Sequence, residues 1–254
     1  MHHVVAQIAY QQLTPITQQR VDYYLKATKI VYPQTSFTEV SGWADELRKE
    51  GVTAFNRWHY IDLPLVIDKP KASPHLYYAS DNIVWAIQQC TRILRDPKTS
   101  DFQKGMFLRW LIHLVADIHQ PLHNASLYSA RFPHGDRGGN LYLVLESSKR
   151  QKDKITNLHA LWDSGYKLPG TSVSLTRHIM QAYPARALQR QIKDTNPWHW
   201  ARQGHRLAKR YAYQVPYNTH PSQQYIKNTR QVSQQQLALA GYRLAYVLNQ
   251  IFAK

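Results

Sequence analysis

Residues 113–123 read HLVADIHQPLH and place three histidines and an aspartate within one short segment. In a helix, residues four positions apart lie on the same face, so His113 and Asp117 point in one direction. Pro121 ends the helix and turns the chain, so that His123 can point in another direction. His119 lies two positions from Asp117 and faces away from it, and we therefore expect it to form a structural hydrogen bond.

A second histidine–aspartate pair with the same spacing, His159 and Asp163, occurs in HALWD at 159–163. One such pair on its own is more often a surface ion pair than a metal site. Two pairs and a further histidine favour a metal site, because imidazole and carboxylate ligands suit zinc. The chain contains 13 histidines in all, which directs attention to metals.

Most of the remaining sequence has the periodicity of helices. Apolar residues recur at helical spacing over 81–95 and 101–119, and they form a long stripe over 237–251. Asp81 is the expected N-cap of the first of these helices. Strand signals are weak and predict at most a short β-hairpin near 140–146, after the turn at 138–140. Residues 66–75 and 129–140 read as surface loops. We predict a single all-α domain over residues 1–254.

Composition narrows the classes of partner. The formal net charge is +16, from 32 Lys and Arg against 16 Asp and Glu, which attracts polyanions such as nucleic acid. A basic surface that only aids solubility is the alternative interpretation. The one cysteine, Cys90, excludes an intramolecular disulfide, and its apolar neighbours indicate a buried side chain. No apolar run approaches the roughly 18 residues that span a bilayer, so we expect no membrane insertion.

Two weaker segments can supply further ligands. Asp45 and Arg48 lie three apart in WADELR at 43–48, and His59 stands among aromatic residues in WHYID at 58–62. Taken alone, a pair such as Asp45 and Arg48 is more often an ordinary exposed carboxylate and arginine than part of a binding site. His59 taken alone is more often a half-buried histidine with a hydrogen-bond partner.

Taken together, these segments resemble the S1/P1 nuclease family, which is similar in fold to bacterial zinc phospholipase C. The resemblance implies a compact, multi-helix phospholipase C/P1 nuclease-like domain and, we expect, a monomer. The matching pieces occur in order and cover nearly two-thirds of the chain: HHVVAQIA at 2–9, WADELR at 43–48, HYID at 59–62, NIVWAI at 82–87, the segment 113–123, GDRGGN at 135–140 and NLHALWD at 157–163.

The resemblance implies three zinc ions. It assigns one zinc to Asp45, His59, His113 and Asp117, and a second to His123, His159 and Asp163. The third would use His2, with Asp117 bridging it to the first.

The family completes that third site with an N-terminal tryptophan a few residues before the histidine, whereas only Met1 precedes His2 here. We expect the natural chain to start earlier, with a signal peptide and this tryptophan. The protein is then expected to be secreted or periplasmic. Without the tryptophan, the third zinc site is incomplete. His3 is expected to be a surface neighbour of the ligands.

The implied activity is zinc-dependent endonucleolytic hydrolysis of single-stranded DNA or RNA and of 3′-nucleotides, with 5′-phosphate products. Zinc lowers the pKa of bound water, so that hydroxide can attack phosphorus at neutral pH. Asp117 and Asp45 would hold and orient that hydroxide, and Arg48 would contact the phosphate.

Base and backbone contacts are expected at positions around this centre. The resemblance places Asp62 and Asn140 at the nucleoside, and the ring of Tyr60, which follows His59, can stack on a base. The same residue types also fit a surface acid, a turn residue and a core-edge aromatic. Basic residues that extend the phosphate track, or else form solvated loops, are Lys69, Lys71, Lys149, Arg150, Lys152 and Lys154.

Two other functions remain open from the sequence. A zinc phospholipase C acting on lipid head groups shares the scaffold, and WADELR with HYID favours the nuclease over it. A noncatalytic basic nucleic-acid-binding protein with structural zinc would bind in a salt-sensitive manner and show no turnover.

Overall fold

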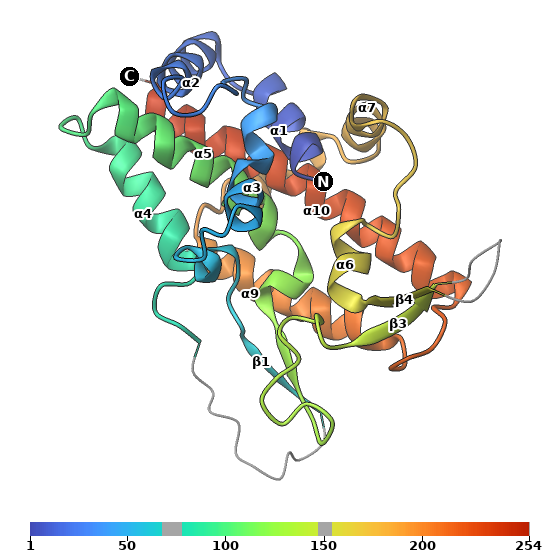
Figure 1. Ribbon diagram of the computed structural model, residues 1–254. Coiled ribbons are helices and arrows are strands. Elements are labelled where there is room, and N and C mark those ends of the chain that lie inside the picture. The colour runs from blue at the N-terminus through green and yellow to red at the C-terminus, as the bar shows by residue number, and fades with distance from the viewer. Residues whose placement is uncertain (68–77, 147–153, 254) are drawn as a thin grey trace.

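The computed structural model describes residues 1–67, 78–146 and 154–253, and most of their length is helical (Figure 1). The prediction of an all-α fold is confirmed. The described α-helices are α1 (His2–Gln11), α2 (Pro15–Ala27), α3 (Trp43–Lys49), α4 (Ile83–Arg95), α5 (Asp101–Ile118), α6 (Leu158–Asp163), α7 (Ser172–Ala182), α8 (Gln189–Ile192), α9 (Pro197–Arg210) and α10 (Gln223–Phe252). Short 3₁₀ turns lie between them at η1 (Glu39–Gly42), η2 (Asn56–His59), η3 (Pro121–Asn124), η4 (Ala185–Leu188) and η5 (Ala212–Gln214).

Helix α5 begins and ends where its sequence signals lie. Ser100 and Gln103 form a capping box, in which each side chain satisfies a backbone N–H at the helix start. The helix ends at Ile118, and Pro121 opens η3, which returns the chain toward the C-terminal end of α5. Helix α4 differs from the prediction in its cap, because Asn82 rather than Asp81 accepts the first backbone N–H groups. An extended residue directly before the helix has the geometry to cap, and Asp81 is one position too early.

Two small sheets accompany the helices. Strands β3 (Leu143–Glu146) and β4 (Lys154–Asn157) pair antiparallel, in the region where a hairpin was expected. Strands β1 (Pro64–Val66) and β2 (Ser126–Tyr128) pair in parallel, and the sequence did not predict this sheet. Strands of three residues are too short to show the alternation by which a strand is recognised. Most of the expected loop at 66–75 lies outside the described residues, whereas 129–140 contains no helix or strand.

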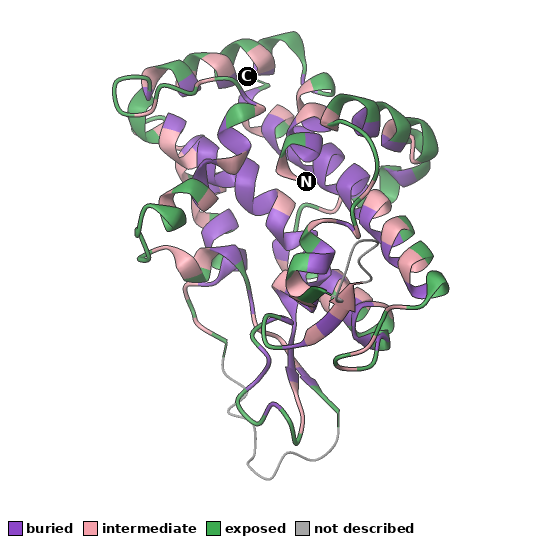
Figure 2. Ribbon diagram, turned by 45° about the vertical axis from the view of Figure 1, so that its right-hand side comes forward, coloured by how far each residue is buried: buried purple, intermediate pink, exposed green. Residues whose placement is uncertain are grey.

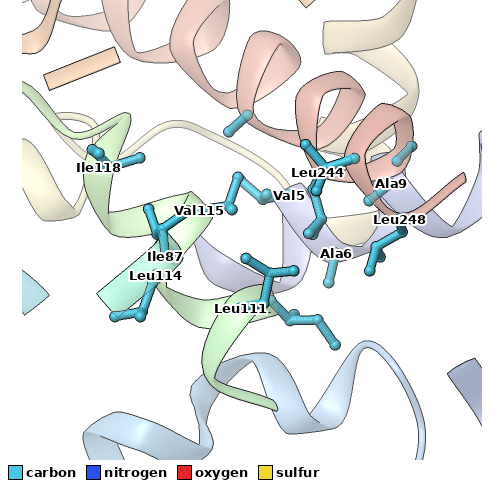
Figure 3. Packing of buried hydrophobic residues seen from close by; sticks show 14 of the residues in the cluster. Val5, Ala6, Ala9, Ile87, Leu111, Leu114, Val115, Ile118, Leu244 and Leu248 are labelled. Atoms are coloured by element: carbon cyan, nitrogen blue, oxygen red, sulfur yellow. The ribbon is translucent and has the colours of Figure 1, made fainter. Parts of the chain in front are cut away.

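The main hydrophobic core is formed where α1, α4, α5 and α10 meet. Figure 3 shows Val5 of α1, Ile87 of α4, Leu111 of α5 and Leu244 of α10 converging on this core, and all four are buried. Cys90 of α4 is buried in the same cluster, as expected. Figure 2 shows buried residues along the centre of these helices and exposed residues on their outer faces.

A second apolar cluster lies around α6, β3 and η5. Helices α9 and α10 contribute to both clusters: Trp200 and Leu237 pack in the first, and Ala208 and Tyr225 in the second. The single-domain organisation stays a prediction. In the described ranges, no helix combines the length and the apolar character needed to cross a bilayer.

Helices α1 and α10 approach closely at a glycine, and this contact positions the start of α1. A Cβ added at Gly241 would lie 2.5 Å from Cβ of Ile8 and 3.1 Å from the carbonyl oxygen of Val5. The glycine therefore allows the backbone of α10 to pass next to α1. Because His2 is the first residue of α1, this packing also determines where His2 lies.

We expect Gly241→Ala to lower the free energy of unfolding by about 1–2 kcal/mol. Overpacking costs about 1–3 kcal/mol, which outweighs the gain of about 1 kcal/mol in helix propensity from glycine to alanine. Gly42→Ala is the matched control, since a Cβ there meets nothing within 4 Å and the residue has a negative φ. Chemical denaturation of both variants tests this, and an equal or higher stability of Gly241→Ala would contradict it.

Candidate metal centre

Histidine and aspartate side chains from six elements converge on one hollow of about 480 Å³. They come from the start of α1, from α3, η2, α5, η3 and α6 (Figure 1). The hollow is lined by most of the predicted ligands, and fully buried His113 lies in contact with them. The two helical pairs therefore face the same space. The lining ligands are His2, Asp45, His59, Asp117, His123, His159 and Asp163.

The first group of ligand atoms surrounds one carboxylate oxygen of Asp117. Oδ2 of Asp117 lies 2.9 Å from Nδ1 of His59 and 3.1 Å from Nε2 of His113. The same two imidazole nitrogens are 3.1 Å apart, and Oδ1 of Asp45 lies 3.9 Å from Nε2 of His113. These four residues thus present four ligand atoms to one point.

The other oxygen of Asp117 faces the start of α1. Its Oδ1 lies 2.9 Å from Nε2 of His2, whose ring stacks on that of His113 at a centroid distance of 4.1 Å. A carboxylate that faces His2 with one oxygen and His59 and His113 with the other has the arrangement that a bridging ligand requires. His3, which follows His2 in the chain, is exposed.

The second group lies between η3 and α6. Nε2 of His123 is 3.6 Å from Oδ1 of Asp163, and Nε2 of His159 is 3.4 Å from Oδ2 of Asp163. The amide of Gln120 donates to Oδ1 of Asp163 over 2.7 Å and so holds this carboxylate in place.

Backbone carbonyls orient three of the imidazoles. Nδ1 of His113 donates to the carbonyl of Ser41 (2.7 Å), Nδ1 of His123 to that of His59 (2.6 Å), and Nδ1 of His159 to that of Gly138 (2.8 Å). A carbonyl oxygen only accepts, so each Nδ1 carries the proton. Once such a ring is neutral, its Nε2 presents a lone pair to the hollow, as a metal-binding histidine does.

The residues present fit zinc in donor type and spacing. Zinc–nitrogen bonds of about 2.0–2.1 Å place neighbouring ligand atoms of a tetrahedron about 3.3 Å apart. The contacts within the two groups range from 2.9 Å (His59 to Asp117) to 3.9 Å (Asp45 to His113). The ligand atoms lie within 4.8 Å of one another in each of three sets: His2, His113 and Asp117; Asp45, His59 and His113; and His123, His159 and Asp163.

Comparison with known proteins shows the family of the chain. The model of the family described as S1/P1 Nuclease matches residues 2–253. The chain belongs to the S1/P1 nuclease family. Among its relatives, it is 29% identical to nuclease S1 of Aspergillus oryzae over 170 residues, 24% identical to Endonuclease 5 of Arabidopsis thaliana over 267 residues, and 26% identical to nuclease P1 of Penicillium citrinum over 172 residues.

The extent of these matches differs. The match to nuclease S1 covers 64% of this chain and 52% of that protein, and the match to nuclease P1 covers 64% and 55%. The match to Endonuclease 5 covers 91% of this chain and 84% of that protein. The match therefore spans about half the length of nuclease S1 and of nuclease P1.

The other predicted site residues of this S1/P1 nuclease family member lie in two places. Arg48 and Asn140 line the same hollow as the ligands, and both are exposed. Tyr60 and Asp62 instead line a neighbouring hollow of about 390 Å³. Of the predicted basic track, only Lys154 lies within the described residues, where it begins β4.

His119 borders the hollow but makes structural hydrogen bonds, as expected. Its Nδ1 donates to the carbonyl of Val115 (2.7 Å), and its Nε2 accepts from Nη1 of Arg243 (2.9 Å). Burial and the charge of Arg243 hold the pKa of His119 well below its ordinary value. The neutral imidazole thus joins the end of α5 to α10.

Asp136 is a positioning residue that the sequence did not single out beyond its place in GDRGGN. Its buried carboxylate accepts from the backbone N–H of Leu127 (2.8 Å) and from the hydroxyl of Tyr213 (2.9 Å). It thereby secures the turn whose next residues include Gly138, the carbonyl partner of His159. An aspartate between glycines was the signal available in the sequence, but Tyr213 lies 77 positions away and no local pattern connects the two residues.

We expect Asp136→Ala to weaken metal binding at the His123–His159–Asp163 group by about 10–100-fold, the usual cost of losing a residue that orients a ligand. Metal titration against a chromophoric chelator measures this. Asp22→Ala is the matched control, because Asp22 also accepts from a tyrosine hydroxyl, that of Tyr10, but outside the hollow. Equal affinities for the two variants would refute the positioning role.

Metal binding should release protons. Burial alone would lower the pKa of His123, but Asp117 and Asp163 outweigh burial and raise it to about 9. At pH 7 the metal-free ring is therefore charged and must lose the proton on Nε2 before that atom binds a metal, so affinity should rise with pH up to about 9. Calorimetry in buffers of different ionisation enthalpy should show release of about one proton or more at pH 7 and less above pH 9. A release independent of pH would contradict this assignment.

Proposed function

We propose that this protein is a zinc-dependent endonuclease and 3′-nucleotidase. It would hydrolyse single-stranded DNA or RNA and 3′-nucleotides at the described hollow and leave 5′-phosphate products. The observation that carries this proposal is the pair of ligand groups around Asp117 and Asp163 in one hollow of an S1/P1 nuclease family member. We further propose that the protein acts as a monomer outside the cytoplasm.

The contacts in the hollow support an assignment of the metal ligands. One zinc would be held by Asp45, His59, His113 and Asp117, a second by His123, His159 and Asp163, and a third by His2 with Asp117. Zinc bound at these residues supplies positive charge to the phosphoryl oxygens and lowers the pKa of water to near 7.

The chain's own side chains would orient the reacting groups. Asp45 keeps 38% of its side chain exposed beside the first group, so its carboxylate can accept a hydrogen bond from the attacking water and orient it. Arg48 also faces the hollow and has no hydrogen bond or ion pair among the described residues. Its guanidinium is therefore free to bind two oxygens of a phosphate, which suits its fork-shaped set of donors.

The neighbouring hollow offers a surface for a base. Tyr60 directly follows the ligand His59, and 37% of its surface is exposed, so its ring can stack on an unpaired base. Asp62 lines the same hollow, where burial and the charge of Asp136 raise its pKa to about 6. Asn140 provides an amide on the side of the ligands. The net charge of +16 attracts the polyanionic substrate to the protein.

We expect the protein to hydrolyse single-stranded DNA, RNA and 3′-AMP faster than a phosphatidylcholine analogue, and to lose activity with a chelator. His113→Ala and Asp163→Asn should each lower kcat/KM at least about 100-fold, since loss of a direct ligand exceeds loss of a residue behind it. Asp163 is 49% exposed, so its variant does not disturb a core.

His178→Ala is the matched control, because His178 is exposed on α7 and lies outside the hollow. Faster turnover of the lipid analogue would favour a phospholipase C. Salt-sensitive binding of nucleic acid with no turnover of any substrate would show that the protein binds nucleic acid without catalysis.

A further inference from the structure

One wall of the metal-ligand hollow is formed by a single face of α10. Ser233, Gln236, Leu237 and Ala240 line the hollow, and their spacing places them on one side of the helix. Helix α6 contributes Trp162 and Asp163 next to them. We call Ser233, Gln236, Leu237 and Ala240 the α10 wall.

Two polar side chains of the α10 wall have little exposed surface and no hydrogen-bond partner among the described residues. Gln236 is 5% exposed and Ser233 is 8% exposed, yet neither makes a hydrogen bond among the described residues. Buried polar groups almost always have a partner, as Arg243 of the same helix does with the carbonyl of Gln191 and the side chain of Gln203. The unpaired amide and hydroxyl are therefore available to whatever enters the hollow.

The chemistry of the α10 wall differs from that of the metal ligands in the same hollow. The four residues of the wall bring an amide, a hydroxyl and apolar surface, but no charge. The charged groups of the hollow, the metal ligands and the guanidinium of Arg48, lie outside this wall. A phosphate therefore fits the charged side, and an uncharged group with hydrogen-bonding edges fits the α10 wall. A nucleobase has both an apolar face and adjacent donors and acceptors, which a glutamine amide can pair in a bidentate manner.

We propose that the α10 wall is a nucleobase subsite, in which Gln236 and Ser233 bind the edge of a base next to the scissile phosphate. This inference rests on the proposed nuclease function. Tyr60 and Asp62 line a different hollow, and no described residue lines both. The two hollows then receive two successive nucleosides of the substrate, which makes a dinucleotide the smallest substrate that fills both.

The test compares a substrate that has bases with one that has none. We expect Gln236→Leu to lower kcat/KM for a dinucleotide, relative to that for bis(4-nitrophenyl) phosphate, by about tenfold, as the loss of one or two hydrogen bonds predicts. Ser233→Ala should change this ratio in the same direction by a smaller factor. Gln235→Leu is the matched control, because Gln235 is the next residue on α10 and does not line the hollow.

Binding of a phosphorothioate-linked dinucleotide, measured by calorimetry, gives a readout that needs no turnover. We expect Gln236→Leu to weaken this binding about tenfold, and Gln235→Leu to leave it unchanged. If Gln236→Leu changes neither the affinity nor the ratio of kcat/KM for the two substrates, the proposed subsite is wrong. Gln236 would then be hydrogen-bonded to water only. Failure of the unmodified protein to hydrolyse any diester would instead overturn the proposed function, while the binding comparison would still decide on the subsite.

Discussion

The carboxylate of Asp117 is the group on which the arrangement of the hollow depends. Its side chain is 3% exposed, and an isolated buried charge is strongly unfavourable. Burial alone would raise its pKa, but His113 and His123 outweigh that effect and hold the pKa well below its ordinary value. The carboxylate therefore stays charged and requires several imidazoles around it. Those imidazoles come from α1, η2, α5 and η3, so one anion connects four segments that are distant in the sequence.

The backbone around this anion is as important as the ligands themselves. The carbonyls of Ser41, His59 and Gly138 each fix the orientation of one imidazole. Each of these carbonyls belongs to a 3₁₀ turn or a glycine turn, where a backbone oxygen is not used by helical hydrogen bonding. The long helices supply a rigid frame, and the short irregular segments between them aim the ligand atoms.

Helix α10 connects the hollow with the core. It packs on α1 at Gly241, and its Arg243 donates a hydrogen bond to His119 at the end of α5. Its Gln236 lines the hollow. The same helix thus stabilises the fold along one side and contributes polar groups to the hollow on another. The central helix α5 contributes in a related manner, with Leu111 in the core and Asp117 in the hollow.

The sequence alone determined the helical class, the two His-x-x-x-Asp pairs and the order of the segments that carry them, because helical periodicity and i, i+4 spacing are local properties. It also indicated that His119 faces away from Asp117. Local patterns could not predict that Asn82 replaces Asp81 as the cap, or that β1 and β2 pair across the chain. Only the tertiary structure decided that His2, His59 and His113 surround one carboxylate and that Tyr60 and Asp62 line a separate hollow. It also decided that Gln236 lines the ligand hollow with no hydrogen-bond partner among the described residues. These features depend on the packing of segments far apart in the chain, and such packing leaves no periodic trace in the sequence.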